Sequence, residues 1–465
     1  MNALMLQGTS SSSGKSLLVT ALARWFARRG VRVAPFKAQN MSNNARAVRG
    51  GEIGVAQYLQ ALAAGVEPDV RMNPILVKPE GDTNSQVIVL GRPDAELSAL
   101  PWVERAQALW EKVEVARRAL QADFDFLLVE GAGSPAEINL RRSDLANMRT
   151  ARATNARVFL VADIDRGGAF AHLYGTWRLI DKKDRRRLRG FILNKFRGDL
   201  ALLDPAPMLL QRRTGIRTIG VVPWLEHELP DEDGVTARPG RGSRPTISIV
   251  RYATASNLDE FRRLDQVADV RYAPSPAEID ADLVILPGSK HVVGDRSWLR
   301  NRGFDDALRA RVAEGRRVLA VCGGLQLLGE SFDGDVDGRG EGLGLLPLQT
   351  RFAADKQVSR RRATFLALPE PWSALSRLRV DGYEIRHGSS TATEPVRRAF
   401  RGGLGFASGP ILAVYLHGLL EQDDVLRALF GTTPELALEQ TFDQLADAVD
   451  EHLDMAAVAA AAGIR

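Results

Sequence analysis

Residues 317–330 read Arg-Val-Leu-Ala-Val-Cys-Gly-Gly-Leu-Gln-Leu-Leu-Gly-Glu, and they contain the only cysteine of the 465-residue chain. The apolar run before Cys322 predicts a buried strand, and the segment after the two glycines predicts a helix. A strand, a sharp turn with a nucleophile at its tip and a helix form an elbow that exposes the nucleophile above a parallel sheet. A backbone N–H in such a turn, here that of Gly323, can hold an oxyanion. This stretch therefore predicts an α/β fold in which Cys322 is a candidate nucleophile.

A lone cysteine can equally be a buried structural residue. His417 favours the catalytic interpretation, because it directly follows the apolar run 411–416 and so ends a predicted strand on the same rim as Cys322. A histidine beside a thiol stabilises the thiolate and can protonate a departing amine. The turn at Gly288 and Ser289 follows another predicted strand, 283–286, and could supply a second oxyanion donor.

Composition indicates an ordinary globular protein of two or three domains. The chain is 45% apolar and 26% charged. A single cysteine excludes a disulfide framework and fits a reducing compartment. No apolar run is long enough to span a membrane, and the N-terminus lacks the pattern of a signal peptide. We therefore expect a cytoplasmic protein with no membrane segment.

The net charge of +5 is concentrated in part in the runs 182–187 and 360–362. Nucleic-acid sites of this kind usually interleave aromatic residues with the basic ones, and neither run contains any. We interpret the runs as solvated surface and expect no nucleic-acid partner, although a polyanionic small substrate would suit the mildly basic surface.

Residues 8–16 read Gly-Thr-Ser-Ser-Ser-Ser-Gly-Lys-Ser and lie between a predicted strand, 3–6, and a predicted helix, 17–26. Small residues before a helix N-terminus let backbone N–H groups converge on phosphate. Lys15 can reach the outer phosphates and the Ser16 hydroxyl can ligate Mg²⁺. The usual phosphate-loop pattern places glycine where Thr9 stands, so Gly8 is displaced by one residue. We predict nucleotide binding by five residues: Gly8, Thr9, Gly14, Lys15 and Ser16.

Other polar residues follow predicted strands, at the sheet edge where open α/β sheets bind ligands. Glu130 ends an apolar run and could hold Mg²⁺ opposite the phosphate loop, or cap a helix instead. Asn194 ends another strand and could read a nucleotide base, or serve as a turn residue. Substrate-binding candidates in the loop after strand 31–36 are Gln39, Asn40 and Ser42, for which a plain polar loop is an equal alternative.

Strands and helices alternate along both halves of the chain, which predicts two mostly parallel sheets flanked by helices. A segment rich in proline and glycine, 223–245, interrupts this alternation. We predict a nucleotide-binding domain at 1–230, a linker at 231–245 and a second domain at 246–465.

The assembled motifs resemble those of the cobyric acid synthase family almost from end to end. The N-terminal half is similar to dethiobiotin-synthetase-like ATP-binding domains, where the same one-residue offset of the phosphate loop occurs. The C-terminal half resembles the flavodoxin-like class I glutamine amidotransferases, whose elbow reads Gly-x-Cys-x-Gly-x-Gln. Here Ala320 replaces the first glycine, whereas Cys322, Gly324 and Gln326 match. The segments that carry the N-terminal resemblance are 8–16, 36–42, 72–79, 129–134 and 194–196.

The chain departs from most class I amidotransferases after the histidine. They continue with Pro-Glu, and the glutamate orients the imidazole, whereas this chain has Gly418 and Leu419. Either Cys322 and His417 act as a dyad, or another acid takes the third position. Glu384 is a candidate for that acid.

The resemblance implies an ATP-dependent C–N ligase of cobalamin biosynthesis. Cys322 and His417 would release ammonia from glutamine, held by Gly288, Ser289, Gly323 and Gln326. ATP with Mg²⁺ would activate a side-chain carboxylate of a corrinoid for attack by that ammonia. The family's substrate is adenosylcobyrinic acid a,c-diamide, amidated at its b, d, e and g carboxylates. Alternatives are a related amidoligase acting on the a and c carboxylates of cobyrinate, or a phosphate-loop binding module with an inactive amidotransferase domain.

Overall fold

The computed structural model describes residues 2–80, 84–230, 244–334 and 338–464. Its N-terminal half is built on a six-stranded sheet in which all neighbouring strands are parallel, as the strand–helix alternation predicts. From edge to edge the strands are β12 (Thr218–Pro223), β11 (Leu188–Phe196), β10 (Arg157–Asp163), β1 (Asn2–Gly8), β9 (Phe126–Glu130) and β2 (Val33–Phe36).

Alternate side chains of the central strand β1 point to opposite faces of this sheet, and each face has its own apolar core. Ala3 and Met5 belong to one core, whereas Leu4 and Leu6 belong to the other. The first core is covered by α4 (Trp102–Asp123), α5 (Met148–Ala153), α6 (Ala169–Leu179) and α8 (Ala206–Thr214). The second is covered by α1 (Lys15–Ala27), α2 (Val55–Ala63), α13 (Leu438–His452) and α14 (Met455–Ala462).

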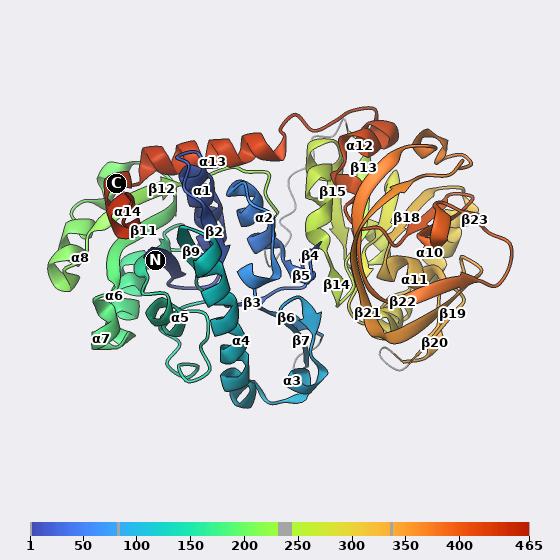
Figure 1. The fold of residues 1–465 in the computed structure, drawn as a ribbon. Helices are drawn as coiled ribbons and strands as arrows, with labels where there is room; N and C mark the ends of the chain where they lie inside the picture. Colours follow the sequence, from blue (N-terminus) through green and yellow to red (C-terminus); the bar gives the residue numbers. More distant parts are fainter. Residues whose placement is uncertain (1, 81–83, 231–243, 335–337, 465) are drawn as a thin grey trace.

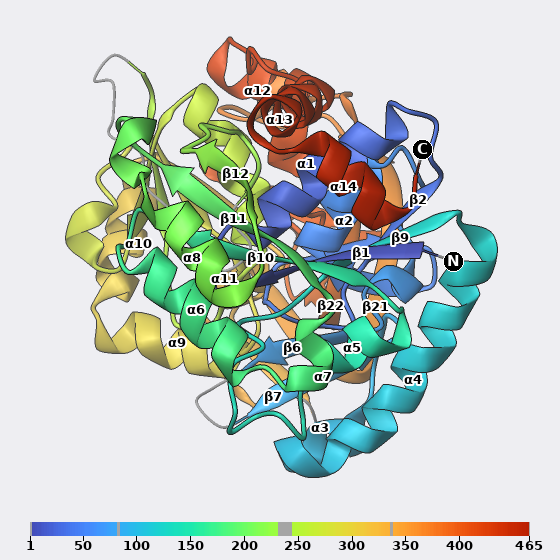
Figure 2. The same cartoon turned by 90° about the vertical axis from the view of Figure 1, so that its left-hand side faces the viewer.

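The helices α13 and α14 come from the C-terminal end of the chain, yet they pack on the N-terminal sheet (Figures 1 and 2). Phe442 and Val449 of α13 are completely buried in the core that α1 covers. Arg24 of α1 donates to Asp443 at 2.8 Å. The sequence-based division, which places everything after residue 246 in the second domain, is therefore wrong for this segment. Of the predicted linker, residues 231–243 lie outside the described residues.

The C-terminal half contains a seven-stranded sheet. Its first five strands are parallel to one another, and each of its last two strands pairs antiparallel with the strand before it. In order they are β15 (Asp269–Ala273), β13 (Thr246–Val250), β16 (Leu283–Leu286), β18 (Arg317–Val321), β25 (Ile411–Val414), β24 (Gly405–Ser408) and β23 (Arg397–Arg398). The elements packed around it include the 3₁₀ helix η3 (Leu258–Gln266), α9 (Val292–Asn301), α10 (Phe304–Ala313), α11 (Gly323–Leu328) and α12 (Asp423–Phe430).

Smaller sheets lie beside the two large ones, and the sequence pattern alone does not anticipate them. A long antiparallel hairpin, β21 (Leu348–Thr364) and β22 (Arg379–Ala392), faces the N-terminal half (Figure 1). The N-terminal half contributes β3 (Gln39–Met41), β4 (Ala45–Val48), β5 (Gly51–Gly54), β6 (Ile75–Pro79), β7 (Ser85–Val89) and β8 (Arg92–Pro93). A shared apolar cluster joins the halves: Ala45, Ala47, Leu76, Ile88, Tyr383 and Ile385.

Every helix in the described residues is too short or too polar to cross a membrane.

Candidate active sites

The phosphate loop connects β1 to α1, and its glycines are required by its geometry. Gly14 has φ +91°, and a Cβ atom there would lie 2.0 Å from Nδ2 of Asn194. That amide donates to the Ser13 carbonyl at 2.9 Å, so Asn194 holds the loop from β11. At Gly8 a Cβ would lie 2.4 Å from Oγ of Ser13. Larger residues at these glycines would therefore displace the loop.

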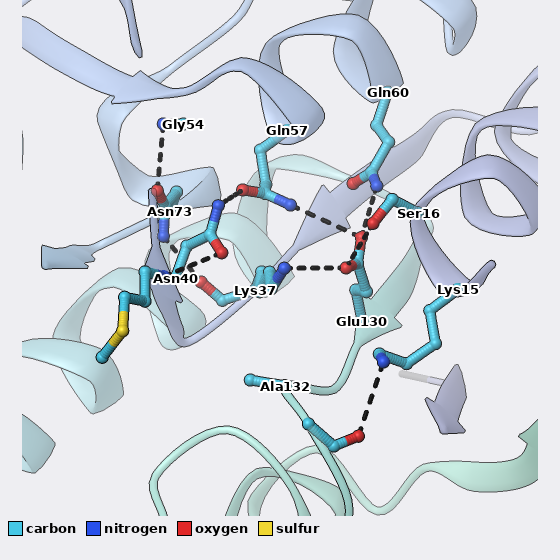
Figure 3. Close-up of polar contacts among 12 residues, drawn as sticks. Lys15, Ser16, Lys37, Asn40, Gly54, Gln57, Gln60, Asn73, Glu130 and Ala132 are labelled. Atoms are coloured by element: carbon cyan, nitrogen blue, oxygen red, sulfur yellow. Dashed lines mark hydrogen bonds and ion pairs between the residues drawn. The ribbon is translucent and has the colours of Figure 1, made fainter. Parts of the chain in front are cut away.

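Glu130 ends β9 directly opposite the loop and is completely buried. Its Oε1 accepts from Oγ of Ser16 at 2.9 Å and from Nζ of Lys37 at 2.8 Å, and its Oε2 accepts from Nε2 of Gln60 at 2.6 Å (Figure 3). The parallel pairing of β9 with β1 and β2 brings these groups together, because the three strands end at the same edge. A buried carboxylate of this kind needs its partners to offset the loss of hydration.

The phosphate loop opens into a cavity of about 940 Å³. The predicted residues that line it are Gly14, Lys15, Ser16, Asn40, Ser42 and Asn194. Gly8 and Thr9 do not line it: Gly8 ends β1, and Thr9 N–H donates to the Val161 carbonyl at 2.9 Å. Gln39, at the start of the short strand β3, also lies outside the lining. The opposite wall of the cavity includes Tyr252, Ala255 and Leu258 of the C-terminal half.

Cys322 stands at the tip of the predicted elbow, between β18 and α11. Its backbone has φ 52° and ψ −105°, a conformation that a non-glycine residue adopts only when its surroundings impose it. Its N–H donates to the Val414 carbonyl of β25 at 2.7 Å. Its Sγ lies 3.6 Å from the Ile385 carbonyl of β22, so the hairpin closes over the thiol.

The turn after β16 lies against the start of α11, as the oxyanion prediction requires. A Cβ atom on Gly323 would lie 2.5 Å from the backbone nitrogen of Ser289. Gly288 approaches the histidine, since a Cβ there would lie 3.3 Å from Cε1 of His417. Gln326 is buried on α11, and a Cβ on Gly388 would lie 2.2 Å from its Nε2. The predicted residues of this half thus gather around Cys322.

His417 is oriented by Glu260, a residue that the sequence analysis did not single out. Nδ1 of His417 lies 2.8 Å from Oε1 of Glu260, and Gly418 N–H donates to Oε2 at 2.8 Å. The Tyr383 ring stacks on the imidazole, with 5.2 Å between the ring centroids. Since Nδ1 is engaged by Glu260, Nε2 is the nitrogen left for the thiol, and Cys322 is among the groups that raise the pKa of His417.

The charges around His417 keep it protonated. Burial disfavours the imidazolium, but the charges of Glu260 and Cys322 and the hydrogen bonds to both outweigh it and raise the pKa of His417 to about 10. A histidine between a carboxylate and a thiol, with its proton retained at neutral pH, is arranged to act as an acid toward a leaving group.

Glu384, the acid considered from the sequence, does not take the third position. It is completely buried, and its two oxygens accept from Nε of Arg361 and Nε of Arg386, each at 2.7 Å. Glu384 lies in β22 and its pairing with the two arginines turns its carboxylate away from His417. The correct residue is Glu260, in η3.

Glu260 and His417 lie far apart in the sequence and share no local motif. The sequence alone therefore gives little evidence that they pair. The available signal is topological: η3 follows β13, and β13 ends on the same rim as β18 and β25. Three further residues contact Glu130 although no motif in the sequence marks them as site residues: Lys37, Gln57 and Gln60. The first lies within the polar segment 36–42, whereas the two glutamines lie on α2 and look like ordinary helix residues.

Two family models match this chain, one in each half. A family model described as the CobQ/CobB/MinD/ParA nucleotide binding domain matches residues 4–234. One described as the CobB/CobQ-like glutamine amidotransferase domain matches residues 246–425. A solved structure of a glutamine amidotransferase has a TM-score of 0.31 and 18% identity, covering 43% of this chain and 98% of its own, a likeness too weak to carry an argument.

Full-length relatives are much more similar. The cobyric acid synthase of Variovorax paradoxus is 53% identical over 97% of this chain and 97% of its own length. That of Paracidovorax citrulli is 52% identical, also over 97% of both chains. That of a Polaromonas species is 49% identical over 97% of this chain and 96% of its own. With both halves matched and nearly the whole length aligned, the chain belongs to the cobyric acid synthase family.

Proposed function

We propose that this chain uses ATP and the amide nitrogen of glutamine to amidate the b, d, e and g carboxylates of adenosylcobyrinic acid a,c-diamide. The observation that carries the proposal is one cavity that is lined by the phosphate loop and by the start of the helix that bears Glu260. Lys15 and Ser16 of the phosphate loop line it, and so does Leu258, which begins the helix that bears Glu260. Ammonia released in the C-terminal half would thus be formed beside the cavity in which the carboxylate is activated.

The glutaminase step uses residues of the C-terminal half. The Sγ atom of Cys322 attacks the side-chain carbonyl carbon of glutamine, and the N–H groups of Gly323 and of the Gly288–Ser289 turn stabilise the oxyanion. The carbon–nitrogen bond breaks as His417 gives its Nε2 proton to the leaving ammonia. Water then attacks the thioester, glutamate leaves and the thiol is restored. Glu260 holds the imidazole in the required orientation throughout, the role of the third residue in a triad.

The amidation step needs an activated carboxylate, because a carboxylate is a poor electrophile. Transfer of the terminal phosphoryl group of ATP to a carboxylate oxygen gives an acyl phosphate, and ammonia then displaces inorganic phosphate. Lys15 and the loop N–H groups bind and orient the phosphates. Asn40 and Ser42 line the same cavity and would contact the arm that carries the carboxylate.

The residues near the loop fit Mg²⁺. The described part of the chain holds no group of three or more His, Cys, Asp and Glu side chains placed to bind a metal. Mg²⁺ in nucleotide sites takes few protein ligands and fills its coordination with phosphate and water. Ser16 and Glu130, which lie within hydrogen-bonding distance of each other, would hold it. When bound, the ion neutralises phosphate charge during phosphoryl transfer.

Mass spectrometry of the corrinoid product tests the proposal, because it counts the amides formed. The purified chain, with ATP, Mg²⁺, glutamine and the a,c-diamide, should convert all of the b, d, e and g carboxylates. Turnover of cobyrinate at only the a and c positions would instead identify the related amidoligase. Absence of any amide, with glutamine or with ammonium, would contradict the proposal.

A further inference from the structure

A segment of the N-terminal half, 44–46, lies against the start of η3, the helix that carries Glu260. Three consecutive residues of one half contact three consecutive residues of the other. The contacts are Leu258 N–H to Oδ1 of Asn44 at 3.2 Å, Asn257 Nδ2 to the Ala45 carbonyl at 2.8 Å, and an ion pair between Arg46 and Asp259. Because Glu260 follows Asp259 directly, this segment fixes the part of the backbone from which Glu260 reaches His417.

Arg46 also reaches His417 by a second route. Its guanidinium donates to the hydroxyl of Tyr383, whose ring stacks on the His417 imidazole. It pairs as well with Glu421, which lies just beyond His417 in the chain. Arg46 is 4% exposed, so these contacts are made away from water, where charge pairing is strong and loss of a partner is costly.

The other end of the same segment belongs to the synthetase cavity. Residues 40–44 line that cavity together with Lys15 and Ser16, and Leu258 lines it from the opposite side. A molecule bound in the cavity therefore lies against both partners of the Asn44–Leu258 contact. From Asn44 the segment continues to Arg46, which contacts the residues around His417.

We propose that Arg46 is a positioning residue for the glutaminase reaction, and that segment 44–46 transmits the occupancy of the synthetase cavity to Glu260 and His417. The inference rests on the proposed function and deepens it, since it assigns the coupling between the two sites to particular residues. The side-chain contacts of Arg46 are to Asp259, Tyr383 and Glu421, and Cys322 is not among them. Arg46 acts through Asp259, Tyr383 and Glu421, which it holds in place around the imidazole.

The physical basis is the balance of buried charge beside His417. Burial raises the pKa of Asp259 and raises the pKa of Glu421 to about 7, and Arg46 opposes both shifts. Without the guanidinium, these carboxyl groups and Glu260 would lose the cation that they share, which leaves the His417 imidazolium and Arg263 to offset their charge. Either they take up protons or η3 moves, and in both cases the Glu260–His417 contact is perturbed.

The test compares Arg46→Met with Arg46→Lys. Methionine keeps an apolar stem but removes the charge and the donors, whereas lysine keeps the charge. For Arg46→Met we expect the glutaminase kcat to fall about tenfold, a loss typical of a coupling residue, with the KM for glutamine within about twofold. Arg46→Lys should recover most of that kcat. Amidation driven by high ammonium should stay within about twofold of the unmodified chain in both variants.

A second readout does not depend on turnover. Cys322 is the only cysteine in the chain, so its alkylation by iodoacetamide reports directly on the thiol beside His417. In the unmodified chain, ATP and the corrinoid should change the alkylation rate, and in Arg46→Met they should not. Arg360→Met is the matched control: the Arg360 side chain also crosses between the halves, to Glu67 and the Ala47 carbonyl, and the pairing of Arg360 with Tyr383 is a backbone pairing of β21 with β22 that the substitution keeps.

The outcomes separate this inference from the proposed function. If Arg46→Met loses glutaminase and ammonium-driven amidation together, Arg46 is structural and the inference fails. It fails also if Arg46→Met keeps full glutaminase activity and a ligand-dependent alkylation rate, or if Arg360→Met behaves in the same way as Arg46→Met. If the unmodified chain makes no amide from either nitrogen source, the proposed function fails, while the glutaminase and alkylation measurements on Arg46 still stand.

Discussion

The Nδ1 atom of His417 lies 2.8 Å from an oxygen of Glu260, although 157 residues separate the two in the chain. The residue after His417 contacts the same carboxylate, through the Gly418 N–H. The position that Pro-Glu fills in most class I amidotransferases is thus supplied by a helix from another part of the sheet edge. Glu260 thus lies beside His417 where the third residue of a triad would be expected.

Replacing Glu260 by glutamine should lower the glutaminase rate about 100-fold, within the range for a positioned acid–base group. The charge of Glu260 is the largest of the effects that raise the pKa of His417 to about 10, and it acts against the effect of burial. Without its charge the pKa falls, and the imidazolium that persists up to about pH 10 in the unmodified chain is lost at lower pH. The high-pH decline of glutaminase kcat/KM should therefore move to lower pH in Glu260→Gln.

The control for that experiment is Glu384→Gln, which removes the charge that pairs with Arg361 and Arg386. It should leave the pH dependence of glutaminase kcat/KM unchanged. If Glu384→Gln shifts that dependence and Glu260→Gln does not, the assignment of the third residue is wrong.

Lys15→Ala should abolish amidation with either nitrogen source, because the loop loses the cation that reaches the outer phosphates. We expect a decrease of at least about 100-fold in amide formation, while the glutaminase rate measured without ATP is kept. Lys183→Ala, at an exposed position of α7 (Lys182–Arg185), is a suitable control. An equal loss of glutaminase activity in Lys15→Ala would show that the loop is needed for the fold rather than for ATP.

Gly14→Ala should weaken ATP binding and lower the free energy of unfolding by about 1–3 kcal/mol, the usual cost of a strained backbone conformation. The cause is the positive φ of Gly14 together with the contact between a Cβ and the Asn194 amide. Gly175→Ala is the matched control, because Gly175 lies inside α6 and a Cβ there meets nothing within 4 Å. That change should stabilise the chain slightly, as alanine favours a helix over glycine. Calorimetry and ATP titration would measure both effects, and equal behaviour of the two variants would contradict the loop geometry.

Phe442→Ala should destabilise the chain by about 3–5 kcal/mol, the cost of removing a fully buried aromatic side chain. Phe442 lies in the core between α13 and α1, so its loss would loosen the N-terminal half. Leu438→Ala, at the exposed start of the same helix, should change stability by less than about 0.5 kcal/mol. Denaturant unfolding measures the free energy of unfolding of both variants. Similar losses in the two would show that α13 is not part of that core.

Much of the fold could be predicted because buried parallel strands are continuous apolar runs, such as 126–129 and 318–321, and the turns after them carry recognisable glycines. The phosphate loop and the elbow are local in sequence, so their residues could be named. Glu260, Arg46 and α13 could not be placed, because each is defined by a contact with a segment far along the chain. Contacts of that kind depend on how the sheets and halves pack, which no local pattern records.

The most direct test of a two-site enzyme follows the nitrogen atom from glutamine to the product. The unmodified chain and Cys322→Ala are each supplied with ATP, Mg²⁺, the a,c-diamide, unlabelled ammonium and glutamine carrying a heavy isotope in its amide nitrogen. We predict that the corrinoid amides made by the unmodified chain carry the heavy isotope, and that those made by Cys322→Ala carry only ammonium nitrogen. Heavy nitrogen in the Cys322→Ala product, or its absence from the product of the unmodified chain, would contradict the assignment of Cys322 as the source of ammonia.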